Sequence, residues 1–553
     1  MQKTCLQCKK HYEITDEDLK FYEKVSPVFN TKKLLITPPD FCPDCRMQQR
    51  LSWRNERHLY KRACDLCGQN MVSTYPANSE YKVYCQKCWF SDKWDPLNFG
   101  KDFDFNRSFF EQFDELIKKV SRTGLISISQ ENSDFCNYVG FAKNSYLCFG
   151  SVHIEDCMYG SPYESRDCVD SLLLRESELC YECINSEKLY GSAFCIDCSS
   201  SSDLMFCYDC KGCKDCIGCA KLRNKQYYIF NEPHTKEEYE RMRERVNASS
   251  FKSLNRFKTE FFNWLKTIPH QYSEILNSEN STGDHIVNSK NARNCYDVKK
   301  AEDCAFCAQI LNAKDSQDVN YCEDFELSYN GIGGYMNNMI SFCNTVWDSN
   351  NVLYSDFCSN SKNIFGCSGV KRGNYQILNK QYTKEEYEEL IPKIIEHMKK
   401  TGEWGQFFPI FISPFPYNES VANEFFPLNK EEAISKKYKW RNPDPKNYQP
   451  QTFVIPDEIK EVPDSIVDEI LACSDCGKNY KILQKELYFY KKMNLPIPHK
   501  CPDCRHKDRM NLRNPRKIND RVCDKCKTGI KTTYSPEKPE KVYCEACYLK
   551  EVY

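Results

Sequence analysis

The chain has 553 residues, of which 41% are hydrophobic and 14% aromatic, so it can fill several cores, and global disorder is excluded. Its length predicts roughly three to five domains. The net charge of -1 says nothing about partners until it is resolved by region. The 36 cysteines are far more than an average protein carries, and they could form disulfides, metal sites or a core of buried thiols.

The N-terminal segment helps to choose between these three. Residues 1–20, MQKTCLQCKKHYEITDEDLK, are polar and lack the apolar core of a secretory signal peptide. No run of about 18 apolar residues occurs, so no transmembrane helix is expected. The most apolar stretch, Phe407–Tyr417, is broken by three prolines. We therefore expect a cytoplasmic protein, in which thiols stay reduced and disulfides are the least favoured alternative.

Residues 1–100 are predicted to form a zinc module, and residues 471–553 a second one, because each contains four CxxC pairs. Two such pairs can complete a tetrahedral site of four thiolates with Zn–S distances of about 2.3 Å. Each end therefore predicts two structural zinc ions, about four in all, although the sequence does not say which pairs share an ion. The predicted ligands are Cys5, Cys8, Cys42, Cys45, Cys64, Cys67, Cys85, Cys88, Cys473, Cys476, Cys501, Cys504, Cys523, Cys526, Cys544 and Cys547.

The two ends are copies of one module. From the second CxxC pair onward the cysteine spacing is identical, with Cys42 matching Cys501 at an offset of 459 residues. Only the first gap differs, because the N-terminal copy holds nine extra residues. A CxxC pair, a variable stretch with Phe-Tyr and then CPxCR before a basic helix resemble the treble-clef zinc-ribbon domains of bacterial proteins of unassigned function. The wider layout resembles uncharacterised multi-cysteine proteins of candidate-phyla bacteria. The motifs cover residues 1–90 and 471–553, and the resemblance implies structural zinc and no established activity.

The second CxxC pair of each copy is predicted to open a helix, because proline between the cysteines suits a first turn. Arginines then recur at i, i+4 and i+8 on one helical face. Such a face can contact nucleic-acid phosphates, and Trp53, His58 and Tyr60 could stack on bases. The candidates for contact with RNA or DNA are Arg46, Arg50, Arg54, Arg57, Arg505, Arg509, Arg513 and Arg516. The alternatives are a solvated face, or docking on a partner protein or on an acidic part of the same chain.

Residues 101–130 are predicted to be a helical linker, and two repeat blocks follow at 131–231 and 283–379. Short phrases such as SDFCNYVG and NSYLCFGS recur every 9–12 residues, and several cysteines stand 21 residues apart. Apolar phrases separated by Ser, Asn, Asp and Gly predict parallel β-solenoids with a period of roughly 20 residues. The blocks are duplicates, since Cys216–Glu240 aligns without a gap on Ile364–Glu388 at an offset of 148.

The cysteines of these blocks are predicted to line the solenoid cores, because a free cysteine behaves as a small apolar residue. Metal binding is the alternative for Cys207–Cys219, CYDCKGCKDCIGC, whose five cysteines could hold zinc or an iron–sulfur cluster. Residues 232–282 and 380–470 are predicted to be helical caps, the second continuing into a strap rich in proline and aromatic residues. Both begin with a threonine before Lys-Glu-Glu, which is typical of a capping box.

The charge is distributed unevenly along the chain. Residues 42–62 carry six Lys/Arg against two Asp/Glu, and residues 501–521 carry seven against three. Residues 131–220 carry fifteen Asp/Glu against six Lys/Arg, and residues 283–370 carry eleven against six. The terminal modules are therefore basic and the repeat blocks acidic.

No sequence motif of a common enzyme class is present, such as GxGxxG, a P-loop, GxSxG or HExxH. We expect a multidomain, mainly β protein with α-helices, in which treble-clef or zinc-ribbon modules flank two β-solenoid-like blocks. Its expected function is non-enzymatic binding of zinc and of RNA or DNA. The alternatives are a protein-interaction scaffold built on acidic solenoid surfaces and a carbohydrate-active solenoid. No membrane partner is expected, and the oligomeric state stays open.

Overall fold

The structure is a computed structural model that describes residues 1–443, 445 and 447–552. The chain divides into two compact units. Unit 1 contains residues 1–125, 273–442 and 516–518, and unit 2 contains residues 126–272, 443–515 and 519–553. The N-terminal cysteine module therefore belongs with the second repeat block, and most of the C-terminal module belongs with the first.

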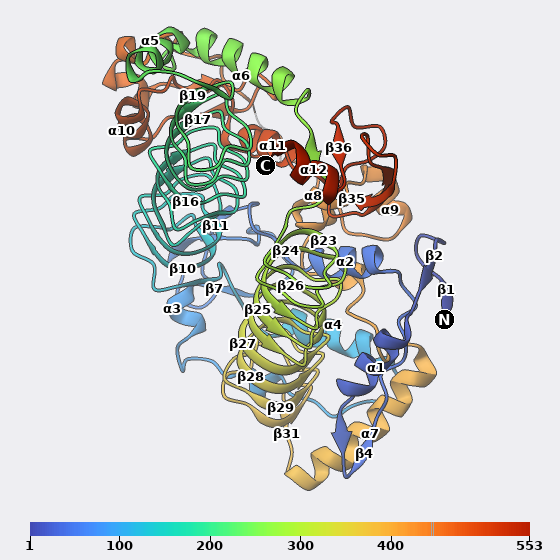
Figure 1. Cartoon of the computed structure of the whole chain (residues 1–553). Helices are drawn as coiled ribbons and strands as arrows, with labels where there is room; N and C mark the ends of the chain where they lie inside the picture. The colour runs from blue at the N-terminus through green and yellow to red at the C-terminus, as the bar shows by residue number, and fades with distance from the viewer. Residues whose placement is uncertain (444, 446, 553) are drawn as a thin grey trace. The chain divides into compact units, whose positions relative to one another are not determined.

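Each unit is built around one large, mainly parallel sheet (Figure 1). Sheet A, in unit 2, contains β9 (Ser127–Ile128), β10 (Asn137–Lys143), β11 (Phe149–Glu155), β12 (Pro162–Tyr163), β13 (Ser165–Val169), β14 (Leu174–Arg175), β15 (Glu178–Tyr181), β16 (Glu187–Tyr190), β17 (Ser199–Met205), β18 (Lys214–Ile217), β19 (Gln226–Ile229) and β20 (Glu232–Pro233). Sheet B, in unit 1, contains β22 (Ile275–Leu276), β23 (Gly283–Val287), β24 (Cys295–Glu302), β25 (Ala308–Lys314), β26 (Gln317–Glu326), β27 (Tyr329–Ser341), β28 (Asn344–Leu353), β29 (Lys362–Phe365), β30 (Asn374–Ile377) and β31 (Lys380–Gln381).

Most paired residues of neighbouring windings lie twelve residues apart in both sheets, with a step of eleven between β11 and β13 and between β22 and β23. Leu204 pairs with Cys216 in sheet A, and Val298 pairs with Ile310 in sheet B, each in parallel register. Figure 1 shows the two segments as stacks of narrow windings. The longer period predicted from the cysteine spacing is therefore wrong. The cysteine spacing of 21 residues is a multiple of three, because every third residue of a winding occupies an equivalent inward position.

This rhythm comes from the backbone. Every third residue along most of the windings has a positive φ, as Asp167 and Asp170 do at 50° and 54°. Asn, Asp and Gly adopt this left-handed conformation at least cost, which explains their frequency between the cysteines. The residue after each such corner points inward. Every third side chain is accordingly buried in the run Cys136, Val139, Ala142, Ser145, Cys148, Ser151, Ile154 and Cys157.

Small polar side chains are accepted inside because each finds a backbone partner. The Ser186 hydroxyl donates to the Ile184 carbonyl at 2.8 Å and accepts from the N–H of Cys198, one winding further on, at 3.1 Å. The Cys198 thiol donates to the Ile196 carbonyl at 3.4 Å. Serine and cysteine can therefore alternate along one inward row without leaving an unpaired polar group.

Two helices pack on the sheets from elsewhere in the sequence. Helix α4 (Phe109–Lys119) precedes sheet A in the sequence but packs on sheet B, with the Phe109 and Tyr354 rings 5.2 Å apart. Helix α6 (Phe251–Leu265) precedes sheet B but packs on sheet A, with the Phe257 and Phe206 rings 5.2 Å apart. The two ring pairs correspond to each other at the offset of 148 residues that relates the two repeat blocks. Each half of the duplicated chain therefore contributes a helix to the unit built on the other half's sheet.

Helices α5 (Lys236–Val246) and α7 (Lys384–Thr401) follow the last strands of sheets A and B. Both have the expected capping box, with Thr235 and Thr383 as N-caps. Tyr387 of α7 packs 5.7 Å from Tyr375 of β30, so the helix covers the final winding of sheet B. After α7 the strap contains α8 (Ala422–Phe425) and α9 (Lys430–Ser435).

The terminal modules consist of short strands and helices. The N-terminal module contains β1 (Gln2–Thr4), β2 (His11–Glu13), α1 (Asp16–Lys24), β3 (Val28–Phe29), β4 (Lys32–Lys33), α2 (Pro43–Leu51), β5 (Tyr60–Ala63), β6 (Asn70–Ser73), β7 (Val83–Tyr84) and α3 (Gln86–Trp89), and β7 pairs with β8 (Arg122–Thr123). The C-terminal module contains β32 (Leu471–Ala472), β33 (Asn479–Tyr480), α10 (Gln484–Met493), α11 (Pro502–Asn511), β34 (Asn519–Val522), β35 (Gly529–Thr532), β36 (Val542–Tyr543) and α12 (Glu545–Val552), and β36 pairs with β21 (His270–Gln271).

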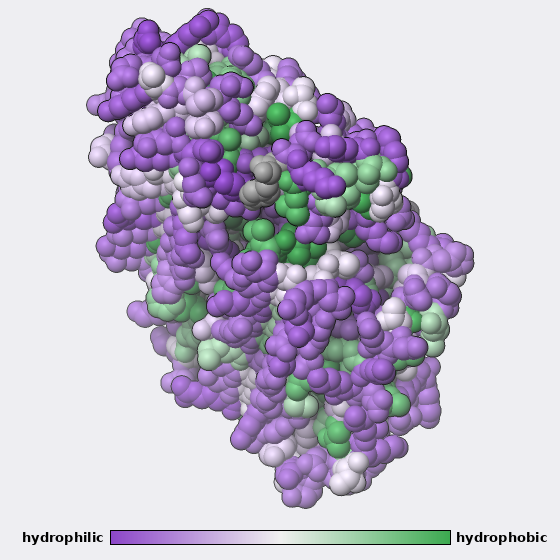
Figure 2. All heavy atoms as spheres, in the orientation of Figure 1, coloured by the Kyte–Doolittle hydropathy of each residue, from purple (hydrophilic) through white to green (hydrophobic). Residues whose placement is uncertain are grey.

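The face of the molecule shown in Figure 2 is mainly hydrophilic, with hydrophobic residues in separate groups. This agrees with a chain in which 28% of residues are charged and most large apolar side chains lie in the unit cores.

Candidate metal centres and the arginine helices

The predicted ligands come together in four groups of four cysteines. In each group the sulfur atoms all lie within 4.8 Å of one another. The first CxxC pair of a module joins the second, and the third joins the fourth, which the sequence left open. The groups are Cys5, Cys8, Cys42 and Cys45; Cys64, Cys67, Cys85 and Cys88; Cys473, Cys476, Cys501 and Cys504; and Cys523, Cys526, Cys544 and Cys547.

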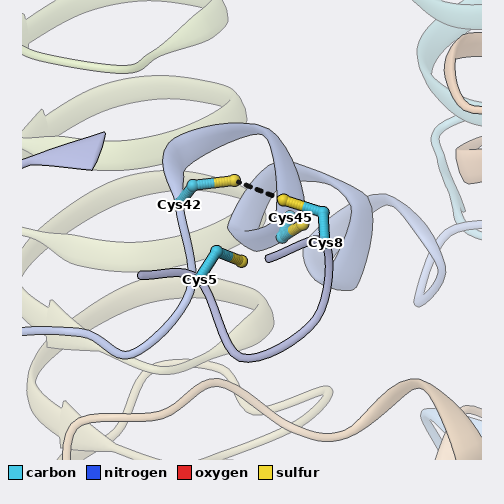
Figure 3. Close-up of side chains that lie close together, drawn as sticks. All are labelled: Cys5, Cys8, Cys42 and Cys45. Atoms are coloured by element: carbon cyan, nitrogen blue, oxygen red, sulfur yellow. Dashed lines mark hydrogen bonds between the residues drawn. The ribbon is translucent and has the colours of Figure 1, made fainter. Parts of the chain in front are cut away.

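Figure 3 shows how the first group is assembled. Cys5 and Cys8 lie on the turn between β1 and β2, while Cys42 and Cys45 lie at the start of α2, where Cys42 is the N-cap and proline occupies the first turn. The predicted helix after CPxC is therefore confirmed in this module, and α11 after Cys501 repeats it.

The sulfur geometry suits a tetrahedral ion. Four thiolates at about 2.3 Å from a zinc ion stand about 3.8 Å from one another. One sulfur pair in each group has nearly this spacing: 3.6 Å for Cys8–Cys42, 3.9 Å for Cys67–Cys85, 3.7 Å for Cys476–Cys501 and 3.7 Å for Cys526–Cys544. The chain therefore offers four sites whose size and donor set fit a structural metal ion.

Hydrogen bonds within these groups favour the thiolate at some cysteines and the protonated thiol at others, such as Cys45, whose hydrogen bond with Cys42 raises its pKa well above the usual range. A hydrogen bond from the Cys45 thiol lowers the pKa of Cys42 to about 5. Burial alone would raise the pKa of Cys64, but backbone N–H groups, including that of Cys85 at 3.2 Å, outweigh it and lower the pKa to about 7. Hydrogen bonds with Thr528 lower the pKa of Cys526 to about 6. Since metals bind the thiolate, the three lowered pKa values favour metal binding near neutral pH, whereas metal binding must displace the proton of a thiol such as Cys45.

The arginines of α2 are not on a free surface. Arg46 and Arg50 are buried and share one carboxylate of sheet B, that of Asp318. The Arg46 guanidinium is 2.8 Å from Asp318 Oδ2, and the Arg50 guanidinium is 3.1 Å from Asp318 Oδ1. Arg50 also donates to Asn320 Oδ1 at 2.7 Å and to Asn330 Oδ1 at 2.9 Å. Helix α2 is therefore held on sheet B by charge-assisted hydrogen bonds.

Helix α11 docks on sheet A in the same way. Arg505 and Arg509 are buried and share the carboxylate of Asp170, at 3.1 and 2.8 Å. Arg505 also pairs with Glu486 of α10 at 3.2 Å. Asp170 and Asp318 are corner residues of the windings, with positive φ angles of 54° and 56°. The same contact thus recurs in both units.

The other candidate arginines behave similarly. Arg54 is buried, pairs with Glu56 at 2.6 Å and lies over the Tyr321 ring. Arg516 is buried and pairs with Asp297 at 3.0 Å. The remaining two, Arg57 and Arg513, are half-buried. Three aromatic residues were expected to stack on bases. Of these, Trp53 is buried, Tyr60 donates a hydrogen bond to Glu419, and His58 is exposed.

The structure does not show the predicted contact with nucleic acid, and it buries six of the eight arginines proposed for it. Arg46, Arg50, Arg54, Arg505, Arg509 and Arg516 are buried and paired with carboxylates of the same chain. Charge complementarity within each unit is the physical reason. The alternative of docking on an acidic part of the chain describes these helices.

Sequence reasoning missed Asp170 and Asp318, because it treated the aspartates between the apolar phrases only as part of the repeat pattern. The two sequence offsets could have revealed these docking positions. Asp170 maps onto Asp318 at 148, and Arg505 maps onto Arg46 at 459, so two acidic and two basic positions recur as a set.

The cysteines of Cys207–Cys219 lie in the core of sheet A. All five are buried, and their thiols donate to backbone carbonyls, as Cys210 does to Tyr208 at 3.6 Å. Within the part of the chain that the structure describes, no group other than the four terminal ones brings metal ligands close enough together. The core alternative therefore describes these thiols better than the metal alternative.

Sheet A also has a shallow groove of about 690 Å³ on its outer face, with Phe141 at its wall. Its charged side chains are largely used in ion pairs along the windings: Lys143 with Glu155 at 3.1 Å, and Arg166 with Glu178 at 2.7 Å.

No protein family matches this chain, and no curated protein matches it either. Among solved structures, that of a proposed acetyltransferase from Desulfovibrio desulfuricans G20 covers 46% of this chain and 68% of its own, with 9% identity and a TM-score of 0.10. A likeness this weak carries no argument about fold or activity. None of the helices among the described residues has the length and apolar character needed to cross a membrane.

Proposed function

We propose that this chain is a non-enzymatic, zinc-stabilised scaffold for protein interactions. Each terminal module holds zinc in two four-cysteine sites and fixes a basic helix on a cysteine-lined β-solenoid, and the outer faces of the solenoids bind the partner. The burial of Arg46 and Arg50 against Asp318, repeated by Arg505 and Arg509 against Asp170, carries this proposal. Since the basic helices are occupied within the chain, the outer faces of the sheets are the better candidates for binding a partner.

Zinc is supported by the donor set. Four thiolates in a tetrahedral arrangement, with no open position, are typical of structural zinc. The parallel register of successive windings and the inward row of small side chains support closed β-solenoids. The twenty free thiols inside the sheets suit a reducing compartment, which supports a cytoplasmic location.

Two measurements on the purified full-length chain test the proposal. Elemental analysis should find about four zinc ions per chain and no stoichiometric iron. Fluorescence anisotropy with labelled single-stranded RNA and duplex DNA should show only weak binding. Fewer than two zinc ions would refute the interpretation of the terminal modules.

Nucleic-acid binding is the function to exclude, and Arg57 and Arg513 provide the variants for it. These two candidate arginines are half-buried, so replacing them by alanine should leave the buried ion pairs intact. Tight binding that weakens steeply with salt and falls in Arg57→Ala and Arg513→Ala would favour nucleic acid over the scaffold function.

A further inference from the structure

The longest strand of sheet B presents a group of large apolar side chains to solvent. On β27, Tyr335, Met336 and Met339 are 43%, 52% and 38% exposed. The half-buried Trp347 of β28 is paired with Tyr335 in parallel register. We call these four residues the β27 patch. Single exposed apolar residues are ordinary, but several on one strand and its paired neighbour mark a candidate interaction surface.

The fold does not require apolar residues at these positions. At the offset of 148 residues, sheet A has a different set at the corresponding places: Glu187, Lys188, Gly191 and Ser199. The docking positions Asp170 and Asp318, by contrast, are the same in both copies. The β27 patch is therefore a feature of one copy only, which points to a ligand rather than to the architecture.

The neighbours of the β27 patch are acidic. Glu323 pairs with Tyr335 on the preceding winding, and the same register places Asp324 and Asp348 on either side of Met336. The residues one winding before or after Tyr335, Met336 and Met339 include no lysine or arginine: they are Glu323, Asp324, Leu327, Trp347, Asp348 and Asn351. An acidic surround disfavours acidic ligands and attracts cationic ones.

Building on the scaffold function proposed above, we propose that the β27 patch binds a segment of a partner protein that carries apolar side chains beside lysine or arginine. Tyr335 and Trp347 supply rigid aromatic contact area, which dominates the energy of many interfaces. Met336 and Met339 adapt to the shape of an apolar side chain. The carboxylates of Glu323, Asp324 and Asp348 select the cationic residues next to it.

Selection from a random library of dodecapeptides tests this. The peptides are selected on the full-length, metal-loaded chain, without counter-selection, and each is then measured on a variant with the sheet A residues, Tyr335→Glu, Met336→Lys, Met339→Gly and Trp347→Ser. The single variant Met336→Lys serves if the fourfold variant does not fold. Tyr190→Glu, at an exposed aromatic residue of sheet A, is the matched control.

The selected peptides should be enriched in lysine or arginine together with apolar residues. Synthesised singly, they should bind the β27 variants at least tenfold more weakly than the unchanged chain or Tyr190→Glu, and their affinity should fall with salt. Enrichment of acidic or uncharged peptides would overturn the proposal. So would concentration-dependent self-association that the β27 variant abolishes, because a second copy would then be the occupant.

The outcomes separate this proposal from the scaffold function. Peptides that bind the β27 variant undiminished would refute the β27 patch as their site while leaving the scaffold function in place. Recovery of no peptide from any surface would refute both. Equal zinc content and equal thermal unfolding of the variants would show that the changes act at the surface.

Discussion

Asp170 and Asp318 lie 148 residues apart in the sequence, at equivalent corners of sheets A and B, and each accepts ion pairs from two buried arginines. The arginines belong to α11 and α2, which are related by the other offset, 459 residues. Each aspartate, which is repeated at the offset of 148 residues, therefore contacts arginines that are repeated at the offset of 459 residues. Since this contact is preserved in both units, we infer that it fixes each terminal cysteine module on its sheet.

Replacing Asp318 by asparagine should destabilise unit 1 strongly. Arg46 and Arg50 would remain buried without a counter-charge, and breaking a buried pair in this way costs about 3–5 kcal/mol. The measurement is the free energy of unfolding in urea, followed by circular dichroism, with the two units analysed as separate transitions. Asp170→Asn should have the corresponding effect on unit 2 alone.

The control for this prediction is Glu302→Gln. Glu302 pairs with Lys314 at 3.2 Å on the exposed face of sheet B. An exposed pair of this kind contributes about 0–1 kcal/mol, so the variant should unfold almost as the unchanged chain does. Equal unfolding of Asp318→Asn and Glu302→Gln would show that the buried network does not hold the module.

The terminal sites could be predicted from the sequence because CxxC chemistry is local. The two thiols of such a pair face one ion whatever surrounds them, so the ligands of all four groups could be named in advance. The docking partner of each helix could not be predicted. Arg50 could have faced solvent, nucleic acid or protein, and only the three-dimensional placement of Asp318 decides the matter.

The period of the sheets was predicted wrongly for a physical reason. Inward positions recur at every third residue, and either serine or cysteine can fill them, as Ser186 and Cys198 do in one row. Cysteine spacing alone therefore samples multiples of three, and it does not single out the multiple that corresponds to one winding. The inner duplication could be predicted because it preserves whole phrases.

Removing one ligand of a terminal group should remove one zinc ion. In Cys45→Ser, three thiolates remain with Cys5, Cys8 and Cys42, and elemental analysis should fall from about four zinc ions per chain to about three. The change should also destabilise unit 1, because zinc binding contributes directly to folding.

Cys210→Ser is the matched control for the metal count. Cys210 lies in the same inward row as Ser186, so a serine fits its surroundings. The zinc content should not change. A loss of zinc or iron in Cys210→Ser would instead show that the sheet thiols hold metal.

The two classes of thiol should react differently with an alkylating reagent. The twenty thiols of the sheets are all buried, and burial raises the pKa of Cys198 well above its usual range. They should stay unmodified until the units unfold.

The sixteen thiols of the terminal groups should become reactive once a chelator removes the metal, because Cys8, Cys67, Cys476 and Cys526 are exposed. Mass spectrometry after mild treatment with iodoacetamide and chelator checks this. Modification of the sheet thiols in the folded chain would contradict it.

The stability of unit 2 should depend on pH through His270. Its ring is 4% exposed, lies 3.3 Å from the Leu265 carbonyl and contacts the Tyr534 hydroxyl at 3.2 Å. Burial, reinforced by the charge of Lys221, lowers the pKa of His270 to about 3. In the unfolded chain the pKa of a histidine is about 6.5.

The folded and unfolded pKa values of His270 determine the direction in which the stability of unit 2 changes with pH. Because the folded pKa is the lower one, the unfolded state binds the proton more readily between pH 6.5 and 3. The contribution of His270 is fully present above about pH 6.5 and is lost as the pH falls towards 3. Between pH 7 and pH 5 the loss should be about 2 kcal/mol.

The measurement is the urea unfolding of unit 2 at pH 7, 6 and 5, in the unchanged chain and in His270→Gln. Glutamine does not titrate in this range, so the variant should lack this part of the pH dependence while keeping that of the carboxylates. If the two chains lose stability in parallel, His270 is not neutral and buried as the structure places it, and the packing of β21 against β36 needs revision.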